Sequence, residues 1–285
     1  VLFDYRFGFV ALIICSVAAF SLANVRYRSA ILRAGVIVAV VSVAPITAMY
    51  MLTAGGLNWQ EFLTSIGFGI GGGLMASVLT IGLLPFFEAA FSILSPMKLI
   101  ELSNPNQPLL RKLLIETPGT YHHSVMVGNL AEGAAEAIGA DGLLARVGAF
   151  YHDLGKTKRP QFFIENQVNG ENPHDKLSPQ LSRTIIINHA LDGVKILREA
   201  HIPKPIQDIA AQHHGTTLLK YFYHKAKQSD DGGQVMEEDF RYPGPKAQFK
   251  EASRGGSTVY WQADSISNRN ARSQNHSRSL RGWAV

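Results

Sequence analysis

Cysteine and charged residues are both scarce in this sequence, and each shortage limits the class of protein to which the chain can belong. The one cysteine among the 285 residues, Cys15, lies in an apolar run, so no disulfide can form within the chain, and a reducing compartment is consistent with it. Charged residues make up only 17% of the chain, and the deficit lies in residues 1–95, which are almost entirely apolar. Residues 96–285 have an ordinary soluble composition. The sequence therefore predicts two domains at most, a membrane-embedded one followed by a soluble one.

Acidic residues and strand-like alternation are scarce as well. The formal net charge is +5, but much of the basic excess lies in the C-terminal tail and in one short loop, so we expect no nucleic-acid polymer as a partner. In the soluble half apolar residues recur at helical spacing, with almost no period-two alternation. The expected fold class is therefore all-α.

Three runs without a charged side chain stand out in the first half: residues 7–23, 34–57 and 62–87. A membrane-spanning helix needs ~20 apolar residues, so the second and third runs are long enough and the first is at the short limit. A signal peptide does not fit the first run, because Asp4 and Arg6 precede it in place of a basic segment and no small-residue cleavage site follows. We expect about three transmembrane helices anchored in a lipid bilayer.

The loops between these runs differ in charge. Arg26, Arg28 and Arg33 lie between the first two runs, whereas residues 53–61 carry no lysine or arginine. Because basic loops stay on the cytoplasmic side, the soluble half should also be cytoplasmic. We therefore expect a multi-pass protein of the cell membrane. Since the first residue is Val1 and not methionine, we expect an upstream part of the protein as well.

The soluble half divides at prolines and glycines. Residues 96–118 form an apolar pattern broken by Pro105 and Pro108, which indicates a connector, and Thr120 is a candidate N-cap for the helix after it. Further helices are expected at residues 121–139, 142–152, 179–190, 191–201, 204–213 and 215–227. The irregular stretch that follows residues 153–156 and continues to Ser178 is unusually long for a compact domain, so we expect it to form part of a site wall.

Five of the ten histidines form an ordered series with one aspartate. Each lies at or near an expected helix end, and the series is His123, His152, Asp153, His189, His213 and His214. Imidazole and carboxylate are the ligands that zinc, iron and manganese prefer. Five imidazoles are too many for one ion, whereas an aspartate can bridge two, and a metal pair ~3.5–4 Å apart suits phosphoryl displacement. The remaining histidines are interpreted as packed or solvated: His122, His174, His201, His224 and His276.

Several motifs carry a resemblance to a known family. His123, residues 152–156 (HDLGK) and residues 213–216 (HHGT) resemble the HD phosphohydrolase superfamily. The fuller set resembles the seven-transmembrane HD receptor family, which contains the membrane-bound cyclic di-AMP phosphodiesterases of the PgpH type. It comprises residues 103–106 (SNPN), 118–124 (PGTYHHS), 162–167 (FFIENQ) and 172–174 (NPH).

The resemblance implies a fold and a reaction. Members of the family have transmembrane helices followed by an all-helical HD phosphohydrolase domain. They hydrolyse cyclic di-AMP to linear pApA with a water activated at a centre of two divalent metal ions, iron or manganese. The substrate partner would thus be a cyclic dinucleotide, and a homo-oligomer is compatible with such a protein.

The resemblance also implies roles for single residues. Three residues would hold the first ion: His123, His152 and Asp153. Asp153 would bridge to the second ion, held also by His189, His213 and His214. Lys156 would neutralise a phosphate oxygen, a role that suits a point charge. The expected catalytic residues are therefore Asp153 and Lys156.

The end of the chain departs from this pattern. The family carries a further aspartate ligand that we expect near residues 257–259, where this chain has no acid, and apolar periodicity vanishes after Phe249. We hypothesise that the reading frame fails just after Glu251. The expected domains are a transmembrane region at 1–95, a connector at 96–118, an HD phosphohydrolase domain at 119–251, truncated at its end, and an aberrant or disordered tail at 252–285.

Two other functions stay open at this point. The histidine series fits equally an HD phosphohydrolase acting on another nucleotide, such as cyclic di-GMP. The atypical tail fits a non-catalytic, truncated signalling remnant.

Overall fold

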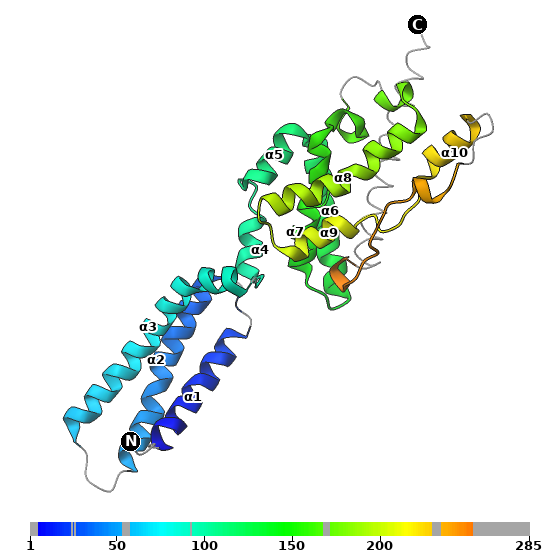
Figure 1. Ribbon diagram of the computed structural model, residues 1–285. Coiled ribbons are helices and arrows are strands. Elements are labelled where there is room, and N and C mark those ends of the chain that lie inside the picture. Colours follow the sequence, from blue (N-terminus) through cyan, green and yellow to red (C-terminus); the bar gives the residue numbers. More distant parts are fainter. Residues whose placement is uncertain are drawn as a thin grey trace. The chain divides into compact units, whose positions relative to one another are not determined.

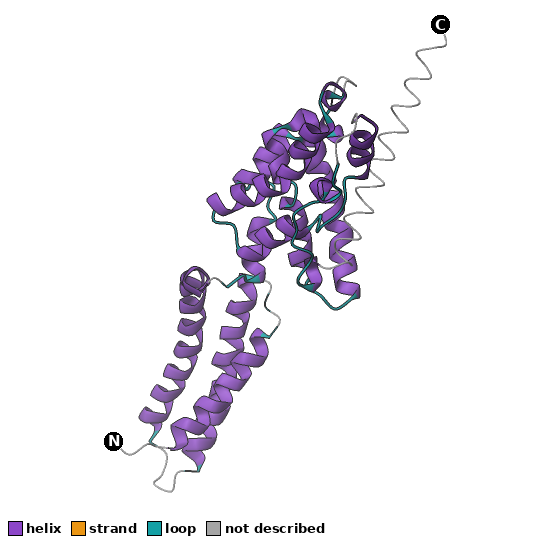
Figure 2. Cartoon of the chain, turned by 45° about the vertical axis from the view of Figure 1, so that its right-hand side comes forward, coloured by secondary structure: helices purple, strands orange, loops and turns teal. Residues whose placement is uncertain are grey.

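The computed structural model describes residues 5–23, 25, 27–52, 58–91, 93–167, 172–229 and 235–252. Within these ranges every extended regular element is a helix, and the one β-pairing is an isolated bridge between Leu218 and Arg241 (Figure 2). The prediction of an all-α fold is therefore confirmed. The chain divides into two compact units, residues 1–98 and 99–285.

In the described part of the first unit three long apolar helices lie side by side (Figure 1): α1 (Tyr5–Leu22), α2 (Arg28–Met51) and α3 (Trp59–Phe91). By length and composition α2 and α3 can each cross a membrane, whereas the apolar part of α1 is shorter. Small residues let α2 and α3 approach closely, since a Cβ atom at Gly73 would lie 2.8 Å from the backbone nitrogen of Ala39.

From Pro96 onward, the described residues form seven helices and several short 3₁₀ turns. In chain order the helices are α4 (Pro96–Leu102), α5 (Pro108–Glu116), α6 (Pro118–Ala137), α7 (Gly142–Tyr151), α8 (Pro179–Glu199), α9 (Lys204–Gln212) and α10 (Lys220–Ser229). The stretch between α7 and α8 contains the turns η1 (Leu154–Lys158), η2 (Pro160–Phe162), η3 (Ile164–Asn166) and η4 (Pro173–Lys176).

Helix α7 lies at the centre of the second unit. A cluster of small apolar residues joins it to α6: Val127, Ala131, Ala135, Ala145 and Ala149. On another side Gly148 faces α9 so closely that a Cβ atom there would lie 2.3 Å from Ile209. At its end Tyr151 is fully buried, and its hydroxyl donates to the carbonyl oxygen of Leu102 at 2.7 Å. The residues that follow Tyr151, His152 and Asp153, are thereby held inside the domain.

Three expected boundaries are wrong. The predicted break between residues 190 and 191 does not exist, because α8 continues through Leu191 to Glu199 with no proline to interrupt it. Helix α6 begins at Pro118, not after Thr120; proline suits a first helical position because the missing N–H would have no helical partner there. The last helix begins at Lys220, after a turn that follows α9. The predicted tail lies outside the described residues from position 253 onward, so the hypothesis about it stays a prediction.

Candidate active site

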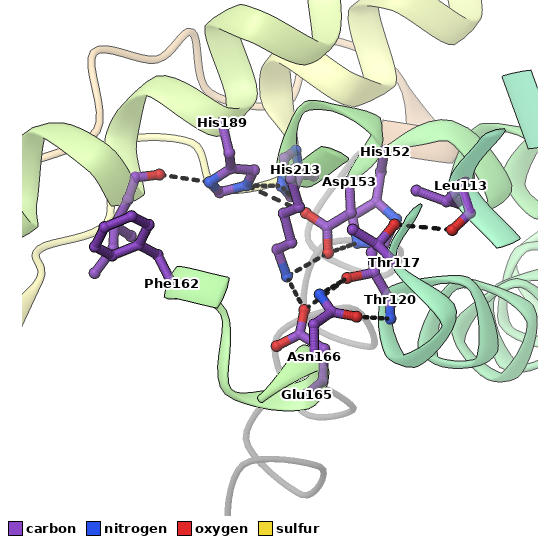
Figure 3. A network of polar contacts seen from close by, with 12 residues as sticks. Leu113, Thr117, Thr120, His152, Asp153, Phe162, Glu165, Asn166, His189 and His213 are labelled. Carbon is purple, nitrogen blue, oxygen red and sulfur yellow. Dashed lines mark hydrogen bonds and ion pairs between the residues drawn. The ribbon is translucent and has the colours of Figure 1, made fainter. Parts of the chain in front are cut away.

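Four separate segments bring the predicted histidines and aspartate to one place. Figure 3 shows four of these residues, His152, Asp153, His189 and His213. His123 lies on α6, His189 on α8, His152 and Asp153 directly after α7, and His213 and His214 directly after α9. The side chains form two groups, His123, His152 and Asp153 in one and Asp153, His189, His213 and His214 in the other. Within each group the potential ligand atoms all lie within 4.8 Å of one another. Asp153 belongs to both groups.

The imidazole rings are oriented by the backbone. The Nδ1 atoms of His152 and His213 each lie 2.7 Å from a carbonyl oxygen three residues earlier, that of Ala149 and of Ala210. His189 makes the same contact with Ile186. A carbonyl oxygen can only accept, so each Nδ1 carries the proton and donates it. When such a ring is neutral, its Nε2 is unprotonated and offers a lone pair, as in metal-ligating histidines whose other nitrogen is tied to the backbone.

These lone pairs face one another and the carboxylate. The Nε2 atom of His189 lies 3.3 Å from that of His213 and 3.2 Å from that of His214. It also lies 3.2 Å from the Oδ1 atom of Asp153. With Nδ1 as the donor in His189 and His213, these contacts bring acceptors together, which a shared cation would stabilise. The donor set therefore fits divalent metal ions, while the assignment of single ligands stays a prediction.

Burial keeps the imidazoles of His213 and His214 neutral. Burial, together with the nearby His152, lowers the pKa of His213 to about 4, although the hydrogen bond to Asp153 opposes the shift. Burial and the neighbouring His213 and His189 also hold the pKa of His214 well below its ordinary value. Neutral imidazole is the form that binds a metal, so both rings are ready ligands at pH 7.

Asp153 is ionised in spite of its burial. Its side chain is 2% exposed, which opposes ionisation, but His152 and the Lys156 ammonium overcome this and hold the pKa of Asp153 well below its ordinary value. The Nζ atom of Lys156 lies 2.7 Å from Oδ2 of Asp153 and 2.8 Å from Oε1 of Glu165. The predicted catalytic pair is thus in direct contact.

Sequence reasoning missed the residues around Lys156. Glu165 and Asn166 of η3 meet Thr120 of α6 across 45 and 46 positions, with Thr120 Oγ1 donating to Glu165 at 3.0 Å. Burial opposes the ionisation of Glu165, but Lys156 outweighs it and the pKa of Glu165 is lowered. The only signal in the sequence was the motif at residues 162–167, to which no physical role was assigned.

A cavity of about 730 Å³ opens beside the two groups, a size typical of small-molecule sites. His123, His189 and His214 reach it from the donor groups. Its aromatic lining consists of Phe162, Phe163, Tyr221, Phe222 and Tyr242, and its charged lining consists of Lys156, Glu165 and Lys220. The stretch between α7 and α8 contributes much of this surface, which confirms the prediction of a site wall.

Two further residues of the cavity were not expected. Tyr242 stacks on His214 with ring centroids 4.2 Å apart, held there because its backbone N–H donates to Thr217 at 3.1 Å. His174 is 5% exposed and packs between Phe162 and Phe222, which agrees with its interpretation as packed or solvated; that it lines the cavity was not predicted. No periodicity or spacing in the sequence indicated either contact.

Known proteins resemble both parts of the chain. Residues 1–95 match the family described as 7TM receptor with intracellular HD hydrolase, and residues 120–243 match the HD domain. The cyclic-di-AMP phosphodiesterase PgpH of Bacillus subtilis (strain 168) is 57% identical over 251 residues, which cover 88% of this chain and 35% of that protein. PgpH of Listeria monocytogenes is 51% identical over 224 residues, 79% of this chain and 31% of that protein.

A solved structure resembles the second unit. The HD domain of the phosphodiesterase PgpH of L. monocytogenes, in complex with cyclic-di-AMP, is 50% identical with a TM-score of 0.55. The match covers 63% of this chain and 87% of that one. The chain spans about a third of the length of the two full-length relatives.

Proposed function

Because the chain belongs to the family of 7TM receptors with an intracellular HD hydrolase, we propose that it is a membrane-anchored, metal-dependent phosphodiesterase that hydrolyses cyclic di-AMP to linear pApA. The observation that carries the proposal is the sharing of Asp153 by two groups of potential ligands beside a cavity. The relatives support the choice of substrate, since both are cyclic-di-AMP phosphodiesterases and the related HD domain has cyclic-di-AMP bound.

The two groups would hold two divalent ions, iron or manganese. His123, His152 and Asp153 would bind one, and Asp153 with His189, His213 and His214 would bind the other. Bound there, such ions supply an activated water and stabilise negative charge on a phosphate. The backbone carbonyls that hold Nδ1 fix the rings so that no reorientation is needed on binding.

Lys156 would act on the substrate phosphate. Its ammonium lies beside Asp153 and lines the cavity, so it can neutralise a phosphate oxygen that approaches the donor groups. The aromatic side chains of the cavity offer flat apolar surfaces against which a nucleobase can stack and exclude water. The aromatic side chains would thus bind and orient the substrate, Lys156 would neutralise its phosphate, and Asp153 would link the two donor groups.

The membrane part would anchor this domain on the cytoplasmic side. The family match of residues 1–95 and the apolar helices α2 and α3 support a membrane protein. The arginines between the first two apolar runs support the cytoplasmic orientation and the multi-pass topology. We assign residues 1–95 to the membrane, 96–118 to a connector, 119–251 to the HD domain and 252–285 to the tail. A homo-oligomer stays a prediction.

Product analysis tests this function. The detergent-purified chain, loaded with manganese or ferrous iron, is incubated separately with cyclic di-AMP and cyclic di-GMP, and the products are resolved by liquid chromatography and mass spectrometry. The expected result is pApA from cyclic di-AMP, with little turnover of cyclic di-GMP and none by Asp153→Ala. Preferred cleavage of cyclic di-GMP would assign another substrate, and no cleavage by metal-loaded protein would indicate a non-catalytic remnant.

A further inference from the structure

Glu165 forms an ion pair with Lys156 and belongs to neither group of potential ligands. Its side chain is 18% exposed, and Lys156 is 12% exposed, so their ion pair is largely shielded from water. Lys156 has a second carboxylate partner in Asp153, at 2.7 Å. The ammonium therefore lies between two carboxylates, one that belongs to the donor groups and one that does not.

Glu165 is itself fixed from the side of α6. Thr120 Oγ1 donates to Glu165 Oε1 at 3.0 Å and accepts from Asn166 Nδ2 at 2.8 Å. Asn166 Oδ1 in turn accepts the Thr120 backbone N–H at 3.2 Å, which satisfies a donor of the first helical turn. The turn and the helix also meet through the backbone, since a Cβ atom at Gly119 would lie 1.9 Å from the carbonyl oxygen of Glu165. Glu165 cannot shift without breaking these contacts.

A lysine needs such a restraint if it is to place a charge accurately. Its ammonium ends a flexible four-carbon chain, so fixing it costs rotamer entropy that one partner seldom offsets. Here the ammonium has Asp153 on one side, Glu165 on another and the Phe163 ring with its centroid 5.1 Å away. Of these contacts, only that with Glu165 is an ion pair to a residue outside the donor groups.

We propose that Glu165 is a positioning residue, which holds the Lys156 ammonium beside Asp153 and affects the reaction through Lys156. The inference rests on the proposed function as far as the reaction is concerned, but the restraint itself can be measured without it. Helix α6 carries Thr120 and His123, so the same helix that supplies a potential metal ligand also sets the position of the lysine.

A double-mutant cycle on the detergent-purified full chain tests the route of action. Glu165→Gln keeps the shape and removes the charge; it should lower kcat about 10- to 100-fold, the cost of a small misplacement, with KM changed much less. Lys156→Met should lower kcat at least as far. If Glu165 acts through Lys156, adding Glu165→Gln to Lys156→Met should cause no further loss beyond about twofold. Glu165→Asp, which keeps a carboxylate, should recover part of the activity.

Three results would overturn the proposal. Glu165→Gln with the activity of the wild type would remove any role. If the reduction of kcat in the double variant equalled the product of the two single reductions, Glu165 would act independently of Lys156. The Glu165 carboxylate belongs to neither donor group, so Glu165→Gln should keep its bound metal. Loss of metal in this variant would show that Glu165 supports the metal site and does not act through Lys156. Asp208→Asn is the matched control, since it removes the acid of a lysine pair with Lys204 on α9 and should leave all constants unchanged.

Lysine labelling tests the restraint without any turnover. Reductive methylation, followed residue by residue by mass spectrometry, should modify Lys156 slowly in the wild type and several-fold faster in Glu165→Gln, with Lys204 as the exposed reference. Equal rates at Lys156 in both proteins would refute the restraint. If the wild type failed to cleave cyclic di-AMP while the labelling rate still rose, the proposed function would fail and the role of Glu165 in holding Lys156 would stand.

Discussion

The backbone of Gly155 lies against the carbonyl group of His189, so that a Cβ atom added at Gly155 would be 1.8 Å from that oxygen. The same atom would lie 2.6 Å from the backbone nitrogen of Gly193. This contact joins η1, which carries Lys156, to α8, which carries His189. The approach of two backbones is therefore part of how the site is assembled.

Replacing Gly155 by alanine should break this contact. Neither backbone can yield as a flexible side chain does, so Gly155→Ala should lower the free energy of unfolding of the second unit by about 3 kcal/mol. Gly133→Ala on α6 is the control, because a Cβ atom there meets nothing within 4 Å and alanine should stabilise the helix by up to ~1 kcal/mol. Urea unfolding followed by circular dichroism measures both. A neutral Gly155→Ala would show that the two backbones are not in contact.

Loss of His189 should affect mainly one of the two ions. His189→Ala removes one of four potential ligands from the second group and leaves the first group complete. Loss of a residue that only hydrogen-bonds to a ligand weakens metal binding by about 10- to 100-fold. Loss of a ligand itself should weaken binding of the second ion by more than this. Metal titration by calorimetry measures it, with His224→Ala on the exposed face of α10 as the control. Equal weakening of both ions would mean that the groups are not separate.

Acid should destabilise the metal-free domain. The pKa of His213 is about 4 in the folded protein and ~6.5 in an unfolded chain, so the unfolded state binds more protons between these values. The free energy of unfolding should then fall as the pH drops from about 6.5 towards 4, by about 3 kcal/mol in total from His213. Asp153 adds nothing in this window, because its pKa is lower still. Thermal midpoints of the chelated chain at pH 7, 6 and 5 measure the effect, and His213→Gln should reduce the slope. A flat profile would contradict the neutral, buried ring.

Chelation should inactivate the protein reversibly. Removal of the ions leaves imidazole lone pairs facing one another and Asp153, so activity should vanish and the thermal midpoint should fall. Manganese or ferrous iron should restore both, whereas calcium should not, because an imidazole-rich set disfavours a hard cation that prefers oxygen ligands. Restoration by calcium, or undiminished activity in chelator, would be inconsistent with a histidine-based metal centre.

The sequence predicted the potential ligands because their signals are local. His152 and Asp153 close a helix, and this pair stood out from helix ends alone. For His189 and for the pair His213 and His214 the spacing was only suggestive, and the resemblance to the family completed the set. The helix break expected between residues 190 and 191 was wrong, because α8 continues to Glu199, and Gly193 within it allows the close approach of η1 to α8. Local propensity does not reveal that packing.

The surroundings of the ligands could not be predicted in the same way. Glu165 meets Thr120 across 45 positions, and Tyr242 reaches His214 only because the segment after α10 returns to pair at Arg241. Such contacts depend on how whole helices pack, which no pattern within one segment encodes. Recognition of the family compensated in part, since its motifs include residues 162–167, although without a physical reason for them.

We propose above that Asp153 joins two metal sites. The metal-to-protein ratio of the detergent-purified chain, measured by inductively coupled plasma mass spectrometry for the wild type and for Asp153→Ala, tests it most directly. We expect two ions per chain in the wild type and the loss of both in the variant, because each group loses its only carboxylate. A wild type without bound metal, or an Asp153→Ala variant that keeps both ions, would contradict it.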